Sequence, residues 1–71
     1  MSGSVYRVTE VVGASSESWE AAARHAVDTA AKTIRDLRIA EATRFDVTIT
    51  DGQIAEYRVR LGISFKYETE D

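Results

Sequence analysis

The sequence predicts an α+β fold in which three antiparallel strands and one amphipathic helix follow one another in the order β-α-β-β. Three observations predict it. Apolar residues recur at helical spacing through the middle of the chain, they alternate with polar residues near its C-terminal end, and an Asp51-Gly52 pair separates two strand-like segments. These features are typical of a helix with one buried face, of a half-buried strand and of a tight hairpin.

The first strand is predicted over residues 4–12, "SVYRVTEVV", which are rich in β-branched and aromatic residues. We expect Gly13 to end it. Its apolar side chains point to both faces, and Glu10 interrupts one of them. A strand that is apolar on both sides predicts cover on both sides of the sheet.

The helix is predicted within residues 13–37, with Ser15 or Ser16 as its N-cap. Trp19 falls on the apolar stripe, so we expect it to pack in the core or an interface. Because most other members of the stripe are alanines, the helix should approach its neighbours closely. The predicted stripe contains Trp19, Ala22, Ala23, Ala26, Val27, Ala30, Ile34 and Leu37.

The second strand is predicted over residues 38–50 and the third over residues 53–68. In the third strand every odd position from Ala55 to Tyr67 is apolar, which predicts one face on the helix and one polar face. A right-handed crossover makes the first two strands parallel. The third strand then fits between them, in the centre of an antiparallel sheet.

The hairpin raises a conflict of register. A two-residue turn at Asp51-Gly52 pairs Thr50 with Gln53, Val47 with Glu56 and Phe45 with Arg58. This pairing would place the apolar side chains of the second strand on the face opposite the apolar face of the third. A one-residue bulge near the turn would remove the mismatch. The alternative, which we favour, is that a second subunit covers the other face.

Composition limits the classes of function. The chain has 71 residues, no cysteine and one histidine, so it forms a single domain (1–71) with no disulfide and no thiolate metal site. Its net charge of −3 argues against nucleic-acid binding. No apolar run or signal segment indicates a membrane, and a cytoplasmic location is expected. So small a core favours self-association.

Nearly the whole chain resembles the dodecin family. The resemblance rests on a strand ending in "VVGAS", a helix opened by serines, the "DG" hairpin and the closing "YRVRLGISF". Dodecins are small β-α-β-β proteins whose sheet wraps around the helix, and they assemble as hollow homo-dodecamers. The resemblance therefore implies the oligomer that the small core already favours.

The resemblance also implies where a flavin would bind. In flavin-binding dodecins a tryptophan at the start of the second strand stacks on the isoalloxazine, and a glutamine of the third strand contacts its polar edge. The matching positions here are Ile39 and Arg58. Because an aliphatic side chain cannot supply the stacking of an aromatic ring, flavin binding is disfavoured. Arg58 retains the ability to pair with an anionic ligand.

The chain is more similar to the calcium-dodecin branch in three short segments, "SWE" at 18–20, "YRV" at 57–59 and "SFK" at 64–66. It also lacks the flavin-stacking tryptophan. Calcium takes six to eight oxygen ligands, mostly from carboxylates and carbonyls. Glu10, Glu20 and Asp46 are the candidate ligands. The site would be assembled from these scattered acids or across a symmetry axis between subunits. Each has an ordinary interpretation as well, as a helix-end charge, a strand charge or the partner of an arginine.

The sequence thus predicts a non-enzymatic shell that binds or stores a small ligand, calcium or another divalent cation rather than flavin. A flavin-binding dodecin with an altered pocket is the first alternative, and a structural shell without a ligand is the second. No nucleophile and base occur together in a catalytic arrangement. We expect no nucleic-acid or membrane partner, only further copies of the chain.

Overall fold

A computed structural model describes residues 3–66, which form β1 (Tyr6–Ser15), α1 (Trp19–Ala31), β2 (Leu37–Thr50) and β3 (Gln53–Lys66). The strands lie in the order β1-β3-β2, and β3 pairs antiparallel with both neighbours. The predicted fold class, with the third strand in the centre, is confirmed. Residues 67 and 68 of the predicted third strand lie outside the described residues.

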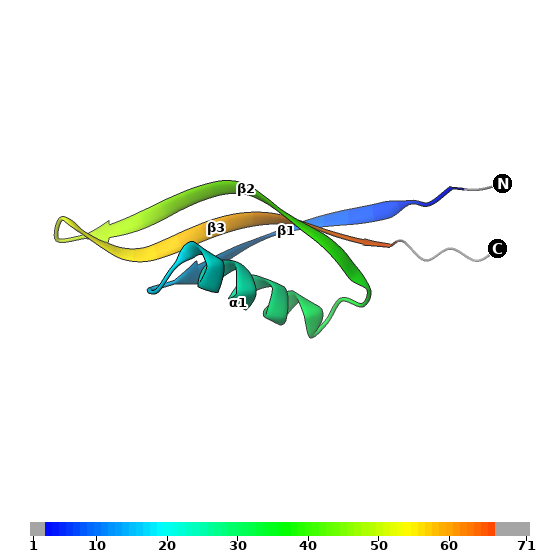
Figure 1. The fold of residues 1–71 in the computed structure, drawn as a ribbon, viewed down its shortest axis with the longest axis horizontal. Coiled ribbons are helices and arrows are strands. Elements are labelled where there is room, and N and C mark those ends of the chain that lie inside the picture. The colour runs from blue at the N-terminus through cyan, green and yellow to red at the C-terminus, as the bar shows by residue number, and fades with distance from the viewer. Residues whose placement is uncertain (1–2, 67–71) are drawn as a thin grey trace.

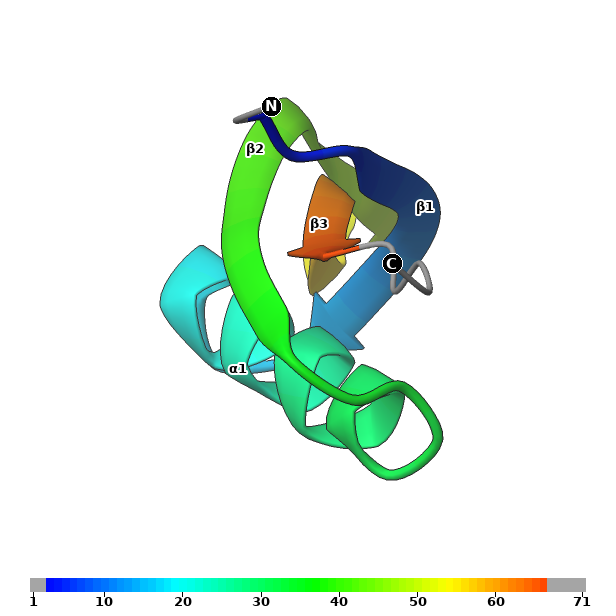
Figure 2. The same cartoon turned by 90° about the vertical axis from the view of Figure 1, so that its right-hand side faces the viewer.

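The sheet curves over one side of α1, so the helix covers one of its two faces (Figure 1). Figure 2, turned by 90°, shows β1, β3 and β2 arched above the helix. We call the face that packs on α1 the covered face and the opposite one the open face. The principal extents of 57 × 20 × 13 Å describe a long, thin subunit, in which little of the chain lies far from solvent.

The core lies between α1 and the covered face of β3. Val59, Leu61 and Ile63 are 1%, 3% and 1% exposed, as the alternation in the sequence predicts. They pack against Ala22, Ala26 and Ala30 of α1, with Val11, Ala23, Val27 and Leu37 partly buried around them. The predicted apolar stripe of the helix is therefore confirmed for its central members.

Gly13 does not end the first strand, as the sequence had led us to expect. β1 continues through Gly13 to Ser15, with Gly13 opposite Val59 of β3. A Cβ atom added to Gly13 would lie 2.1 Å from the carbonyl oxygen of Ala22. The glycine is required because the backbone of α1 crosses β1 at this point, and not because the chain turns there.

The helix is shorter than predicted. Ser18 is its N-cap, since its Oγ accepts a hydrogen bond from the amide of Ala21 at 3.0 Å. The predicted cap was wrong: Ser15 still belongs to β1 and accepts from the amide of Glu17. The helix ends at Ala31, so Ile34 and Leu37 follow it in a turn and in β2. No helix of residues 3–66 is long and apolar enough to cross a membrane.

The conflict in the hairpin is resolved by a bulge. Asp51 and Gly52 have φ angles of 53° and 76°, as a two-residue turn of type I′ requires. Thr50 pairs with Gln53, but the register then shifts, and Val47 faces Tyr57 while Phe45 faces Val59. The predicted pairs of Val47 with Glu56 and Phe45 with Arg58 are wrong. The bulge returns both side chains to the covered face, so the register gives no argument for a second subunit.

Candidate functional site

The open face is built from rows of side chains that cross the three strands. Because paired residues of an antiparallel sheet share a face, the register gives each row directly. From the Ile39 end towards the hairpin the rows are Val8–Ser64–Ile39, Glu10–Gly62–Glu41, Val12–Arg60–Arg44 and Ala14–Arg58–Asp46. Most of the sequence-predicted site residues lie in these rows.

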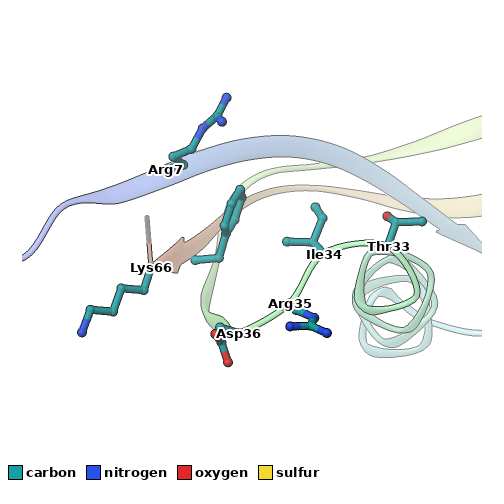
Figure 3. A pocket seen from close by; sticks show the side chains of 7 residues that line it. Arg7, Thr33, Ile34, Arg35, Asp36 and Lys66 are labelled. Carbon is teal, nitrogen blue, oxygen red and sulfur yellow. The ribbon is translucent and has the colours of Figure 1, made fainter. Parts of the chain in front are cut away.

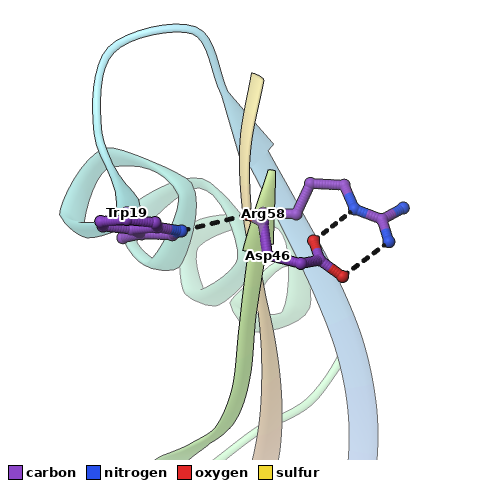
Figure 4. Close-up of polar contacts among 3 residues, drawn as sticks. All are labelled: Trp19, Asp46 and Arg58. Atoms are coloured by element: carbon purple, nitrogen blue, oxygen red, sulfur yellow. Dashed lines mark hydrogen bonds and ion pairs between the residues drawn. The ribbon is translucent and has the colours of Figure 1, made fainter. Parts of the chain in front are cut away.

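Asp46 and Arg58 form the best-defined polar contact of the open face (Figure 4). The Nε and Nη2 atoms of Arg58 donate to the two carboxylate oxygens of Asp46 at 2.8 and 3.0 Å. These hydrogen bonds hold the pKa of Asp46 below its usual value and raise the pKa of Arg58. A bidentate pair of this kind fixes both side chains and uses two of the three nitrogens of the Arg58 guanidinium.

Trp19 binds the same strand from the covered face. Its Nε1 donates to the carbonyl oxygen of Asp46 at 3.2 Å, and its ring lies edge-on to Phe45 and Tyr57, with centroids 5.9 and 5.1 Å away. The expectation that Trp19 serves packing is confirmed, although it remains 38% exposed. Sequence reasoning missed that Trp19 and Arg58 hold Asp46 from opposite faces, because this depends on the register beyond the bulge.

Glu10 pairs with an arginine of its own chain. Nη1 of Arg60 donates to its Oε1 at 3.4 Å, a long contact, and the Glu10 side chain is 60% exposed. The ordinary interpretation of Glu10 in the sequence was that it pairs with an arginine. Arg60 provides the same explanation within one chain, and the length of the contact leaves the carboxylate accessible.

The three acids predicted as calcium ligands do not meet within one chain. Glu20 lies exposed in the first turn of α1, in the other layer of the fold. Glu10 and Asp46 lie on opposite edge strands, two rows apart, which is roughly 14 Å along the strands. Within residues 3–66, no three His, Cys, Asp or Glu side chains are close enough to share a metal ion.

Glu41 is an acidic residue that the sequence analysis did not weigh. It faces Glu10 across Gly62, in one row of the open face. A Cβ atom added to Gly62 would meet only Val8, at 3.6 Å, so little fills the space between the two carboxylates. The signal in the sequence was the glycine within β3, but the bulge near Thr43 had to be known before Glu41 could be placed opposite it.

Ile39 and Arg58, the positions matched to the flavin site, also lie apart. Ile39 faces Ser64 and is 64% exposed, and Arg58 lies six residues away along β3. At the rise of an extended strand this is about 20 Å. One flavin ring could therefore contact both positions only if they came from two different copies of the chain.

A cavity of about 400 Å³ lies at the end of the subunit opposite the hairpin, where the segment after α1 passes β1 and β3. Its lining includes Arg7, Arg35, Asp36 and Lys66. These charged side chains point away from one another (Figure 3), so they form no convergent set of ligands. The open face remains the better candidate site.

A comparison with known proteins decides the family. The dodecin family model matches residues 5–68. The chain belongs to the dodecin family. Calcium dodecin of Mycobacterium tuberculosis is 38% identical over 63 residues, which cover 89% of each chain. Dodecin of Thermus thermophilus is 39% identical over 66 residues, covering 93% of this chain and 96% of that protein.

Solved structures agree with this dodecin in fold. Dodecin from Streptomyces coelicolor superposes with a TM-score of 0.90 at 43% identity, covering 99% of this chain and 100% of the other. The crystal structure of the Mycobacterium tuberculosis calcium dodecin, described as calcium-chelating with a calcium-binding site, gives a TM-score of 0.81 at 38% identity and covers 96% and 97% of the two chains. The prediction from "VVGAS", "DG" and "YRVRLGISF" is thus confirmed.

Proposed function

We propose that this dodecin assembles into a closed shell of identical subunits, a homo-dodecamer, and binds calcium or another divalent cation on the open face of its sheet without performing chemistry. The assembly is supported by the apolar side chains that one subunit leaves uncovered. Val8 and Ile39, which lie in one row at the end of the open face, are both 64% exposed. Side chains of this size are seldom left exposed together unless another surface covers them.

The observation that carries the choice of ligand is the Asp46–Arg58 pair. Arg58 stands at the position that contacts the polar edge of flavin in flavin-binding dodecins, and here two of its three donating nitrogens, Nε and Nη2, are bound to a carboxylate of the same chain. Ile39 stands at the stacking position. A flavin would compete with Asp46 for the Arg58 guanidinium and would gain no aromatic stacking from Ile39.

The acids of the open face support a cation. Glu10 and Glu41 flank Gly62, and among residues 3–66 Glu10 is held only by the 3.4 Å contact with Arg60. Two carboxylates supply fewer oxygens than the six to eight that calcium takes. The remaining ligands would come from water and from acids of another copy, among them Glu20 and Asp46. The calcium-binding relative at 38% identity makes calcium the first ion to test.

Isothermal titration of the assembled, chelator-treated protein with calcium chloride tests this proposal. We expect saturable binding that Glu10→Gln weakens by roughly tenfold, since one ligand charge is removed. Glu17→Gln is the matched control, because Glu17 is an exposed acid in the loop before α1 and should leave the affinity unchanged. Native mass spectrometry of the same samples reports the number of subunits and of bound ions.

Two other results would replace the proposal. Quenching of riboflavin fluorescence at nanomolar protein would show that the open face binds flavin despite Ile39 and Arg58. Absence of both calcium uptake and riboflavin quenching, with a melting temperature that a chelator does not change, would leave a structural shell. A monomer in native mass spectrometry would overturn the assembly itself.

A further inference from the structure

The row next to the Asp46–Arg58 pair of the open face contains two arginines side by side. Arg44 of β2 lies directly opposite Arg60 of β3, with Val12 of β1 completing the row. Like charges directly opposite each other on neighbouring strands are destabilising. The carboxylates in the adjacent rows are Glu10 and Glu41 on one side and Asp46 on the other.

These carboxylates do not neutralise the arginine row. Asp46 is held by the Nε and Nη2 atoms of Arg58, and Glu10 reaches Arg60 only at 3.4 Å. Within residues 3–66, Arg44 forms no ion pair. The pKa of Asp46 is lowered mainly by its hydrogen bond to Arg58, and the positive charges of Arg44 and Arg60 lower it further. Within the part of the chain that the structure describes, the charge of Arg44 is therefore left without a carboxylate partner.

Arg60 provides a second, independent observation. Its Nε atom is buried and has no hydrogen-bond acceptor within the described part of the chain. A buried donor without an acceptor is uncommon in folded proteins and indicates a missing partner. The Nη1 atom of the same guanidinium makes only the long 3.4 Å contact with Glu10, so the donors of Arg60 are poorly satisfied within residues 3–66.

From these observations we infer that Arg44 and Arg60 form a binding site for a phosphate group on the open face of the sheet. A guanidinium presents its N–H donors as a planar fork that matches two oxygens of a phosphate. A tetrahedral oxyanion has enough oxygens for both forks, whereas a carboxylate has two in total. The site adjoins the proposed cation ligands, because Arg60 contacts Glu10, but phosphate binding in calcium-free buffer does not require a bound cation.

The source of the phosphate group is either inorganic phosphate or a phosphomonoester. Val12, which lies in the same row and is 50% exposed, gives an apolar surface beside the anion. A phosphomonoester with an apolar body would contact it. Phenyl phosphate that binds more tightly than inorganic phosphate, with the difference lost in Val12→Ser, would indicate an ester, and equal affinities would indicate the free ion.

Isothermal titration of the assembled full chain with inorganic phosphate, in calcium-free buffer of constant ionic strength, tests the site. We expect Arg44→Gln to weaken binding by about tenfold or more, as the loss of a charge-assisted pair implies. Arg38→Gln is the matched control: Arg38 is an exposed arginine of the same strand outside the row, and the variant should bind as the unmodified protein does. Circular dichroism melting checks that both variants fold.

Three results would overturn the inference: no binding of phosphate by the unmodified protein, equal weakening in Arg38→Gln and Arg44→Gln, or unchanged binding in Arg44→Gln. The second would show attraction to overall positive charge only. If Arg44→Gln instead breaks the assembly in native mass spectrometry while phosphate has no effect on the unmodified protein, the partner of the row is an acid of another copy. Calcium titration of Arg44→Gln should match the unmodified protein, so the two proposals fail separately.

Discussion

The two faces of the sheet differ in what determines their residues. On the covered face, Val59, Leu61 and Ile63 meet a helix of the same chain and are at most 3% exposed. On the open face, the alternating positions of the same strand are Arg58, Arg60 and Ser64, beside the exposed Val8 and Ile39. One side of β3 thus belongs to the core of the subunit, and its other side belongs to a surface that the subunit leaves uncovered. The fold of the subunit depends on the first face, and its assembly and ligands depend on the second.

The largest expected contrast between the faces comes from deleting aliphatic side chains. Leu61→Ala removes a side chain that is 3% exposed and should lower the free energy of unfolding by about 2–5 kcal/mol, because the cavity is closed in by α1. Ile39→Ala removes a side chain that is 64% exposed in the subunit, so it should leave the fold of the subunit intact and weaken the assembly.

Urea unfolding followed by circular dichroism measures the first effect, and native mass spectrometry at decreasing protein concentration measures the second. If Ile39→Ala lowers the stability as much as Leu61→Ala without changing the number of subunits, the distinction between the faces is wrong. Equal loss of assembly in both variants would show that folding and assembly are one event.

Glycines provide a second contrast, with a smaller expected effect. Gly13→Ala places a Cβ atom on the covered face 2.1 Å from the Ala22 carbonyl oxygen, so α1 has to move away from β1. We expect a loss of about 2 kcal/mol, in the range of other overpacked sites. Gly62→Ala is the matched control on the open face, because its Cβ would meet Val8 at an ordinary 3.6 Å. Differential scanning calorimetry of both variants should show a lowered melting temperature for Gly13→Ala alone.

The same contrast explains what the sequence could and could not predict. Alternation along β3 and the alanine stripe of α1 predicted the covered face, because burial by the same chain follows a simple period. The end of β1 was predicted wrongly. The sequence does not distinguish a glycine that lets a helix backbone pack closely from a glycine that ends a strand. Register was the other failure. Bulges near Ala55 and Thr43 shift the pairing by one residue each, and no residue type marks them unambiguously.

The prediction of the candidate site was affected most by these shifts of register. Asp46 was chosen from the sequence as a cation ligand, but its pairing with Arg58 and its contact with Trp19 follow only from the register beyond the bulge. Glu41 and Arg44 were passed over for the same reason. Both are ordinary charged residues of a strand until the register places one across from Glu10 and the other beside Arg60.

The smallest expected effect concerns the Asp46–Arg58 pair, which lies at the surface of the open face. Its hydrogen bonds lower the pKa of Asp46 below the ordinary value of 3.8, so the folded state favours the charged carboxylate. The stabilisation is present above the unfolded-state pKa and is lost as the pH falls through the lower, folded-state pKa. Asp46→Asn should therefore unfold at a slightly lower urea concentration at pH 6, and the difference should disappear towards pH 2.5.

Glu41→Gln is the control for this comparison, because Glu41 is exposed and forms no ion pair within residues 3–66. Its urea midpoint should follow that of the unmodified protein over the same pH range. Sodium chloride at 1 M should reduce the effect of Asp46→Asn, since the pair is solvent-exposed and salt screens such charges. A difference between Asp46→Asn and the unmodified protein that persists unchanged at pH 2.5 would have to come from the backbone of β2, where Trp19 donates to the Asp46 carbonyl, and not from the carboxylate.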